Sequence, residues 1–233
     1  MRGALCFLKR SADLMKTLIA VPCMDTMESD FVDCLLHLKP VGEVEIRLLR
    51  GSLVYDARNQ ITQYALSQDF DYVLWLDSDM TFEPDLMEKL LADIEGRDDI
   101  DAVTGLCFGR RPPFKPCIYK RLEIKRDGNM VMPIAENWFN YPRDQLFEVE
   151  ACGFACVLMK IDTLKATGIY GQVPFYPIGG MGEDLTYCRR AKDLGIRFWC
   201  DSRLKIGHLM RVGVDETFRD TVMSGSAEET GQA

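Results

Sequence analysis

A short apolar segment that ends at two carboxylates constrains the fold more than any other part of the chain. The segment is Tyr72–Leu76, and Asp77-Ser78-Asp79 follows it directly. An apolar run of this length, bounded by polar residues, is typical of a central strand that is buried on both faces. Side chains two positions apart in an extended chain point the same way, so Asp77 and Asp79 can converge at the carboxyl end of that strand. Open α/β sheets bind their ligands at this edge.

The two carboxylates suggest a cation site. Carboxylates held close together repel each other, and a divalent cation relieves that repulsion. Hard oxygen ligands suit Mg²⁺ or Mn²⁺, and such an ion is commonly shared with the phosphates of a substrate. The other interpretation is a solvated acidic turn that caps the helix after Pro84. The motif alone leaves both interpretations open.

Strands and helices alternate through the first half of the chain. Strand-like composition or alternation is found at 17–21, 44–48, 72–76 and 102–106. Helical spacing of apolar residues is found at 31–38, at 54–67 and in the segment that opens near Pro84 and buries Met87, Leu90, Leu91 and Ile94. This order predicts an α/β fold with a mainly parallel central sheet.

The alternation loosens in the second half. A basic, proline-rich loop is expected at 110–116, and a hairpin is expected where 119–124 and 130–134 flank a turn at 126–129. The remaining expected elements are a strand at 155–160, a glycine-rich loop at 179–182, a helix at 183–194 with Gly195 as its C-cap, and a strand at 197–200.

Composition narrows the class of protein. A chain of 233 residues is long enough for one substantial core, and its formal net charge of −8 argues against a broad nucleic-acid surface. No apolar run approaches the roughly 20 residues that a membrane-spanning helix needs. The apolar patch in 1–16 is too short for a secretory signal. The nine cysteines are scattered without a CxxC pair, which favours reduced thiols and a cytoplasmic location.

Two further motifs carry polar groups that could act chemically. Gly182-Glu183-Asp184 places two carboxylates in the first turn of a helix, where acids also complement the helix dipole without any further role. His208 follows Gly207 near the end of the fold, and imidazole is a common ligand of Mn²⁺. A lone histidine can equally be structural, so both interpretations stay open for each motif.

The order of these features resembles the glycosyltransferase-A fold, and most closely the family-two-type glycosyltransferases, over roughly 17–212. Ala57-Arg58-Asn59 looks like the family's ARN segment, and EACGFACVLM at 150–159 looks like the segment before its acceptor site. The stretch GEDLTYCRRAKDLGIRFWCDSRLKIGH at 182–208 resembles the block that ends in Gly-His. The resemblance implies a single Rossmann-like catalytic domain at 17–222 with a small acceptor-side subregion, an N-terminal extension at 1–16 and a disordered tail at 223–233.

The resemblance also implies an activity: metal-dependent transfer of a sugar, of the hexosyltransferase type, from a nucleoside-diphosphate sugar to a hydroxyl acceptor. The donor would be of the UDP or GDP type, and inversion would use Asp184 as general base while Glu183 orients the acceptor or the loop. Asp77, Asp79 and His208 would hold Mn²⁺ or Mg²⁺. The residues implied at the nucleotide are Pro22, Asp25, Arg58, Asp77 and Ser78, and those implied at the acceptor are Trp138, Gly153 and Gly182.

Several of these roles have simpler alternatives. Asp25 could cap a helix that begins near Thr26, and Arg58 could be a surface charge on the second helix. Trp138 could be part of a packed aromatic lid rather than a platform on which a sugar stacks. The chain also departs from the family's usual P-x-Y-N after the first strand, since it has Pro22-Cys23-Met24-Asp25 there.

Two other functions compete with sugar transfer. A nucleotidyltransferase would carry a glycine-rich loop with a Lys or Arg after the first strand, and 22–28 has no such loop. A catalytically silent module that binds a nucleotide or a sugar would be expected to lack Asp79, Asp184 or His208, and all three are present. Retention of configuration and self-association into a homo-oligomer stay open.

Overall fold

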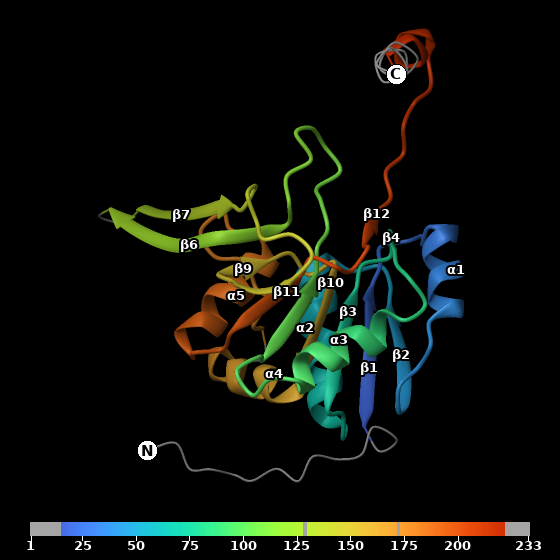
Figure 1. Cartoon of the computed structure of the whole chain (residues 1–233). Coiled ribbons are helices and arrows are strands. Elements are labelled where there is room, and N and C mark those ends of the chain that lie inside the picture. The colour runs from blue at the N-terminus through green and yellow to red at the C-terminus, as the bar shows by residue number, and fades with distance from the viewer. Residues whose placement is uncertain (1–14, 128–129, 172, 222–233) are drawn as a thin grey trace.

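The computed structural model describes residues 15–127, 130–171 and 173–221 (Figure 1). A seven-stranded sheet forms the centre of the domain, with the strand order β2-β1-β3-β10-β5-β11-β8. Its strands are β1 Lys16–Pro22, β2 Glu43–Leu49, β3 Tyr72–Leu76, β5 Ala102–Gly105, β8 Leu146–Val149, β10 Cys156–Lys160 and β11 Phe198–Asp201. The expected strands at 17–21, 44–48, 72–76, 102–106, 155–160 and 197–200 all lie in this sheet.

The sheet is mainly parallel, as the alternation predicted. β1 pairs in parallel with β2 and β3, and β11 pairs in parallel with β5. β10 is inserted antiparallel between β3 and β5, and β8 is antiparallel to β11. Because Cys156 at the start of β10 pairs with Leu76 at the end of β3, the residues just before β10 lie at the same edge of the sheet as the Asp-Ser-Asp turn.

Helices cover both faces of the sheet. They are α1 Ser29–His37, α2 Val54–Ser67, α3 Leu86–Glu95, α4 Ile161–Thr167, the 3₁₀ helix η2 Gly168–Tyr170 and α5 Glu183–Asp193. Alternate side chains of β3 divide between two cores, because Val73 and Trp75 pack with α2, α4 and α5, whereas Leu74 and Leu76 pack with α1 and α3. This explains why the whole of β3 is buried and apolar.

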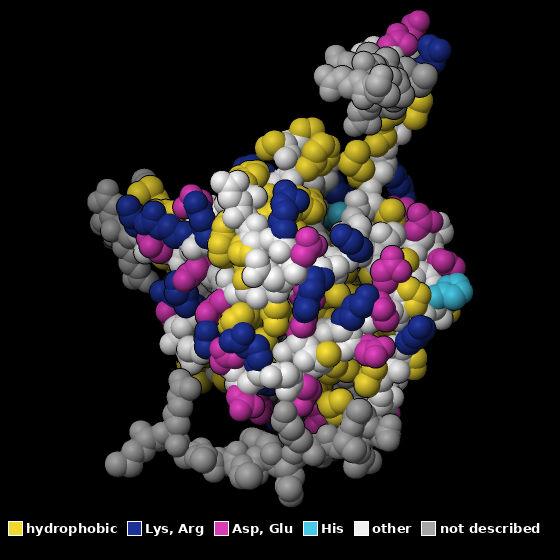
Figure 2. Space-filling view, in the orientation of Figure 1, with side chains coloured by type: hydrophobic (Ala, Val, Ile, Leu, Met, Phe, Trp, Pro, Cys, Tyr) yellow, Lys and Arg dark blue, Asp and Glu magenta, His cyan; other side chains and the backbone are white. Residues whose placement is uncertain are grey.

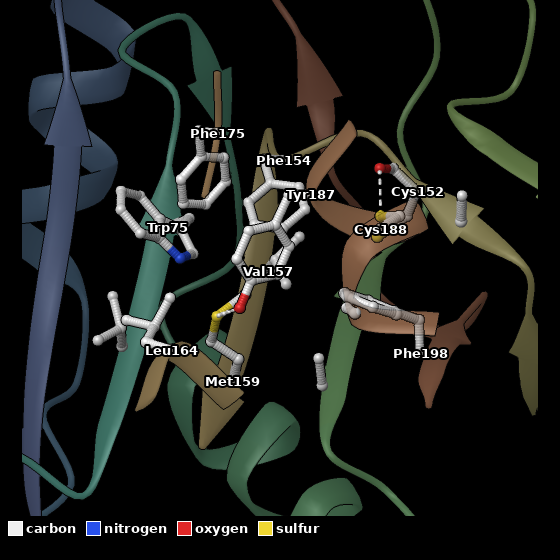
Figure 3. Close-up of a cluster of buried hydrophobic side chains, with 14 of the residues drawn as sticks. Trp75, Cys152, Phe154, Val157, Met159, Leu164, Phe175, Tyr187, Cys188 and Phe198 are labelled. Carbon is white, nitrogen blue, oxygen red and sulfur yellow. Dashed lines mark hydrogen bonds between the residues drawn. The ribbon is translucent and has the colours of Figure 1, made fainter. Parts of the chain in front are cut away.

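An aromatic cluster fills the core on the α2, α4 and α5 side (Figure 3). Phe154 lies edge-on to Tyr187 and Phe175, with ring centroids 5.2 Å apart in each pair. Trp75 lies edge-on to Phe175 at 5.3 Å, and Phe175 stacks on Tyr187 at 4.4 Å. Offset and edge-on contacts of this kind add stability beyond the apolar area that the rings bury. The cluster therefore fixes the end of β3 against the first turns of α5.

Two small sheets complete the described fold. β6 Ile118–Asp127 pairs with β7 Met130–Asn137 and β9 Ala151–Cys152, and the β6–β7 hairpin projects from the domain (Figure 1). The hairpin expected from 119–124 and 130–134 is therefore present, although its turn residues 128–129 lie outside the described residues. The second sheet joins β4 Met80–Thr81 to β12 Gly207–His208. Strands of this length leave no periodic signal in a sequence.

Element boundaries follow local chemistry. α2 occupies the expected range, whereas α3 begins at Leu86, slightly after Pro84, and buries the four predicted residues. Gly195 follows the C-cap of α5 with φ of +75°, a conformation that favours glycine. β1 begins at Lys16, inside the expected extension, while the tail at 223–233 and most of that extension lie outside the described residues.

On the face shown in Figure 2, basic and acidic side chains are interspersed rather than separated into one basic patch. This distribution agrees with the net charge of −8 and offers no broad basic surface for a nucleic acid on that face. Among the described helices, none has the length and apolar character needed to cross a membrane.

The pairing of β4 with β12 requires glycine at position 207, because a side chain there would collide with Thr81. A methyl group built on Gly207 would lie 2.2 Å from Thr81 Oγ1, with Thr81 Cβ at 3.6 Å. We therefore expect Gly207→Ala to lower the free energy of unfolding by about 1–3 kcal/mol, and Thr81→Ala to remove most of that loss in the double variant. Urea unfolding measures both effects. Gly213→Ala, where the added methyl meets nothing within 4 Å, is the control. An equal loss in the Thr81→Ala background would contradict this explanation.

Candidate functional site

A pocket of about 270 Å³ opens where β1 and β3 end. It is lined by Pro22, Cys23, Met24, Ser52, Val54, Ala57, Asp77, Ser78, Asp79, Arg110 and His208. Of the residues predicted at a nucleotide or a metal, the structure brings together Pro22, Asp77, Ser78, Asp79 and His208 at this pocket. It does not place Asp25 or Arg58 among the lining residues.

Arg58 is buried rather than on the surface, and its role at the nucleotide stays a prediction. Its side chain is 1% exposed, so it is neither a surface charge nor part of the pocket wall. Its Nη2 donates to Asp77 Oδ1 at 2.9 Å, and its Nε lies 3.6 Å from Glu183 Oε1. The guanidinium carbon lies 5.5 Å from the ring centroids of both Trp75 and Phe154. Arg58 is therefore a buried cation that joins the end of β3 to the start of α5.

Neither interpretation of Asp25 is seen in the structure. The side chain is exposed and does not line the pocket. It does not cap a helix near Thr26 either, because α1 begins at Ser29 and its N-cap residue is Glu28. The departure from the family pattern after the first strand thus coincides with an exposed Asp25 that does not line the pocket.

Asp79 has two cationic or basic neighbours. Its Oδ2 lies 2.7 Å from Arg110 Nη1 and 3.4 Å from His208 Nε2. The β4–β12 pairing sets this arrangement, because His208 pairs with Met80 and Leu209 N–H donates to the Asp79 carbonyl at 2.8 Å. Residues that are far apart in the sequence are thereby placed against one carboxylate.

The orientation of the His208 ring follows from its second nitrogen. Nδ1 lies 2.8 Å from the carbonyl oxygen of Phe108. A carbonyl only accepts, so Nδ1 carries the proton and Nε2 faces Asp79. The hydrogen bond to Asp79 raises the pKa of His208. Burial pushes the pKa of Asp79 upward, but His208 and the Arg110 guanidinium outweigh it and hold that pKa below its usual value.

The donor set at Asp79 and His208 fits a divalent cation in part. A ring whose Nδ1–H donates to a carbonyl presents Nε2 as metal ligands of this kind do. Asp77 is turned toward Arg58, and Arg110 occupies one oxygen of Asp79. Within residues 15–127, 130–171 and 173–221, no group of three His, Cys, Asp or Glu side chains is arranged to hold a metal ion. Two protein ligands are nevertheless compatible with an ion that takes the rest of its oxygens from phosphates and water.

Asp184 lies at the start of α5, beside two glycines that were predicted at the acceptor. A methyl group built on Gly153 would lie 3.6 Å from Asp184 Oδ2, and one built on Gly182 would lie 3.1 Å from Oδ1. Leu185 N–H donates to Asp184 Oδ1 at 2.7 Å. Burial, and then the negative charge of Glu183, raise the pKa of Asp184 to about 6. The absence of side chains at Gly153 and Gly182 thus leaves space for the Asp184 carboxyl group, whose pKa is higher than that of an ordinary aspartate.

Trp138 packs into the protein rather than standing free. Its ring lies edge-on to Phe147 with centroids 5.2 Å apart, and it packs against the core on the α5 side. The neighbouring Phe139 is 53% exposed. Trp138 is thus a partly buried side chain that packs on Phe147, and its role at the acceptor stays a prediction.

Arg110 is the functional candidate that sequence reasoning missed. The expected loop at 110–116 exists and connects β5 to β6, yet nothing in its spacing indicated that one of its arginines would reach Asp79. The prolines and the two adjacent arginines of this segment indicated only a basic loop between two strands. Contacts between a loop and a distant strand end depend on the path of the backbone, which the sequence does not encode in a periodic way.

Comparison with known proteins finds a family model and solved structures that resemble this chain. The family model described as "Glycosyl transferase family 2" matches residues 44–151, a range that runs from β2 to β9 and includes the Asp-Ser-Asp turn and Arg110 but not α5 or His208. No curated protein matches the chain significantly. Two solved structures share the fold over most of this chain.

The first structure is titled "Crystal Structure of A197 from STIV". It has a TM-score of 0.59 and 20% identity, and the similarity covers 84% of this chain and 87% of that one. The second is titled "Crystal structure of GalNAc-T7 with UDP, GalNAc and Mn2+". It has a TM-score of 0.51 and 12% identity, and covers 90% of this chain but 48% of that one. At these identities the likeness concerns the fold.

The raised pKa of Asp184 predicts a gain in stability when its charge is removed. A carboxyl whose pKa is about 6 in the folded chain, against an ordinary value of 3.8, is disfavoured by folding once it ionises. The penalty is absent below about pH 4, grows up to about pH 6 and is complete above it. We expect Asp184→Asn to raise the free energy of unfolding by about 1–2 kcal/mol at pH 7.5, after allowance for partial exposure.

The measurement is urea unfolding at pH 7.5 and at pH 4. Asp193→Asn, at the exposed other end of α5, is the control and should change stability by less than about 0.5 kcal/mol. A gain for Asp184→Asn that is the same at both pH values would show that the ionised carboxylate is not its source.

Proposed function

We propose that the chain is a family-two-type glycosyltransferase that transfers a sugar from a nucleoside-diphosphate sugar to a hydroxyl acceptor. The family model that matches residues 44–151 and the two solved structures of similar fold support this proposal. The observation that carries the proposal is one geometric fact. Asp79 and His208 face each other across 3.4 Å at the sheet edge where Arg58 also connects Asp77 to the helix bearing Asp184. A donor side and an acceptor side are therefore adjacent.

The donor would occupy the pocket beside β1 and β3. Asp79 and His208, with Asp77 directly or through water, would hold Mn²⁺ or Mg²⁺, and the ion would supply Lewis-acid stabilisation of the leaving diphosphate. Arg110 is 51% exposed, so its guanidinium can exchange Asp79 for a phosphate, to which it offers paired donors. A donor of the UDP type is supported by the UDP in the solved GalNAc-T7 structure.

In this proposal Asp184 would act as the general base. Its Oδ1 accepts the Leu185 N–H, which leaves Oδ2, on the side of Gly153, available to an acceptor. In the proposed reaction Asp184 removes the proton of the acceptor hydroxyl while that oxygen attacks the anomeric carbon. The bond from the sugar to the diphosphate breaks, and the configuration inverts. A base with a pKa near 6 is ionised at neutral pH and more basic than an ordinary aspartate.

The competing functions explain less of the structure. A nucleotidyltransferase does not need a base at Asp184, and the loop after β1 has no glycine-rich phosphate site. A silent binding module gives no reason for a carboxyl of raised pKa beside two glycines. We propose a cytoplasmic location as well, in agreement with the eight described cysteines, which are all free thiols.

Asp184→Asn should abolish transfer while leaving donor affinity close to that of the wild type. The amide keeps the shape but accepts no proton, and loss of general-base assistance costs about 10²–10⁴-fold in rate. In the wild type the rate should rise with pH through about 6, because only the ionised form of Asp184 is the base. Glu183→Gln should move this rise to lower pH, since the charge of Glu183 raises the pKa of Asp184.

The measurement is release of nucleoside diphosphate from UDP- and GDP-sugars in the presence of a panel of hydroxyl acceptors. Asp193→Asn on the same helix is the control for rate. Near-wild-type turnover by Asp184→Asn would overturn the base assignment and favour a retaining mechanism or a capping role.

Nucleotide binding should depend on a divalent cation. Titration calorimetry with UDP and GDP, with Mn²⁺ or with a chelator, should show binding that weakens about 10- to 100-fold in Asp79→Asn and His208→Ala. His37→Ala, at an exposed position of α1, should bind as the wild type does. Arg58→Ala should weaken binding indirectly, because it frees Asp77. Equal affinity with Mn²⁺ and with chelator would contradict the cation role of Asp79 and His208.

A further inference from the structure

Two cysteines face each other at the base of the loop that carries Arg110. Cys117 N–H donates to the Cys107 carbonyl at 2.9 Å, and Gly109 N–H donates to the Lys115 carbonyl at 2.8 Å. These bonds flank the bridge between Phe108 and Pro116. The pattern makes Cys107 and Cys117 directly opposed residues on two antiparallel segments, at a position where the backbones are hydrogen-bonded.

Directly opposed residues of this type suit a disulfide. Their Cα atoms lie about 5.5 Å apart and their side chains share one face, whereas a disulfide needs a Cα separation of about 4.4–6.8 Å. The two side chains influence each other, because Cys117 raises the pKa of Cys107 and Cys107 lowers the pKa of Cys117. Cys107 is 2% exposed, but Cys117 is partly exposed. A small oxidant can therefore reach Cys117, and the bond can form without a change in the path of the backbone.

We propose that Cys107 and Cys117 are a reversible disulfide site that restrains the loop at 108–116. The loop supplies two groups to the pocket, since Arg110 pairs with Asp79 at 2.7 Å and the Phe108 carbonyl accepts from His208 at 2.8 Å. In the disulfide form Arg110 stays on Asp79, where a cation and a diphosphate would otherwise bind. This consequence rests on the proposed function, whereas formation of the disulfide does not.

The chemistry is thiol–disulfide exchange with a small disulfide such as oxidised glutathione. The Cys117 thiolate attacks one sulfur of that disulfide, and the other sulfur leaves as a thiolate. Cys107 then attacks the Cys117 sulfur, passes its proton to the departing glutathione thiolate and closes the bond. The protein loses two electrons and two protons, and one oxidised glutathione becomes two thiols. The Cys107 side chain lowers the pKa of Cys117, which increases the thiolate fraction of the attacking group.

A second thiol pair provides an internal comparison. Cys188 Sγ on α5 donates to the carbonyl oxygen of Cys152 on β9 at 3.5 Å (Figure 3), and Cys188 raises the pKa of Cys152. Both side chains are 0% exposed, so an oxidant does not reach either thiol while the protein is folded. The two cysteine pairs are thus alike in that their members lie close together. They differ in whether an oxidant in solution can reach one of the thiols. We expect only the Cys107–Cys117 pair to be oxidised.

The first experiment identifies the bond. The full chain is incubated with oxidised glutathione, blocked with iodoacetamide and digested with trypsin without reduction. Cleavage between Arg110 and Arg111 separates the two cysteines, so the proposal predicts a linked pair of peptides, 98–110 and 111–120, that dithiothreitol separates. Cys117→Ser should lose the linked pair, and Cys34→Ser should keep it. Glutathione on Cys117 without linkage, or a Cys152–Cys188 bond in its place, would overturn the proposal.

The second experiment measures the consequence. UDP and GDP are titrated with Mn²⁺ into the oxidised and the reduced full chain. We expect affinity about tenfold weaker in the oxidised form, because the fraction with Arg110 away from Asp79 falls, with recovery after dithiothreitol and no change in Cys117→Ser. Equal affinity in both forms would overturn the restraint of the loop. If neither form binds nucleotide, the proposed function fails, and the linked peptides decide the disulfide independently.

Discussion

The arrangement of the site depends on one buried cation. Arg58 is 1% exposed, and it holds Asp77 at 2.9 Å and Glu183 at 3.6 Å, while its guanidinium carbon lies 5.5 Å from the ring centroids of Trp75 and Phe154. A charge removed from water is costly unless it is paired, so the two carboxylates must stay where Arg58 can reach them. The end of β3 and the first turn of α5 are thereby fixed to each other, and these two segments carry the acids that the proposed function assigns to the donor and the acceptor.

Different partners give the acids different chemistry. Asp77 pairs with Arg58, and Asp79 pairs with Arg110 and His208. Among the described residues the structure shows no ion pair for Asp184, which accepts only from the backbone of Leu185. Its pKa is accordingly raised to about 6, while that of Asp79 is lowered. An acid without a cation is the one best able to take a proton, and the paired acids are better suited to cations and phosphates.

Helices and strands with a clear periodic pattern of apolar residues could be predicted from the sequence. Individual contacts between residues that are distant in the sequence could not. β3 and α2 occupy their expected ranges because burial on both faces, or on one helical face, leaves a clear pattern of apolar residues. α4 was missed because it follows β10 without a break, so its apolar residues extend an apolar strand. His208 could be placed beside Asp79 only through the family resemblance, since a two-residue strand leaves no pattern.

The roles of Arg58 and Arg110 show why residue type is a poor guide to position. Both were arginines in polar surroundings of the sequence, yet one is buried and the other is 51% exposed at the pocket. Burial of Arg58 depends on Glu183, which is distant in the sequence but lies 3.6 Å away in the fold. The position of Arg110 depends on the backbone hydrogen bond between Cys107 and Cys117 at the base of its loop. The buried cation makes one half of the site rigid, whereas the exposed one lies on a loop that is held mainly at its base. The acids near Arg58 are therefore preorganised, and the environment of Asp79 is the part of the site that a ligand or an oxidant can change.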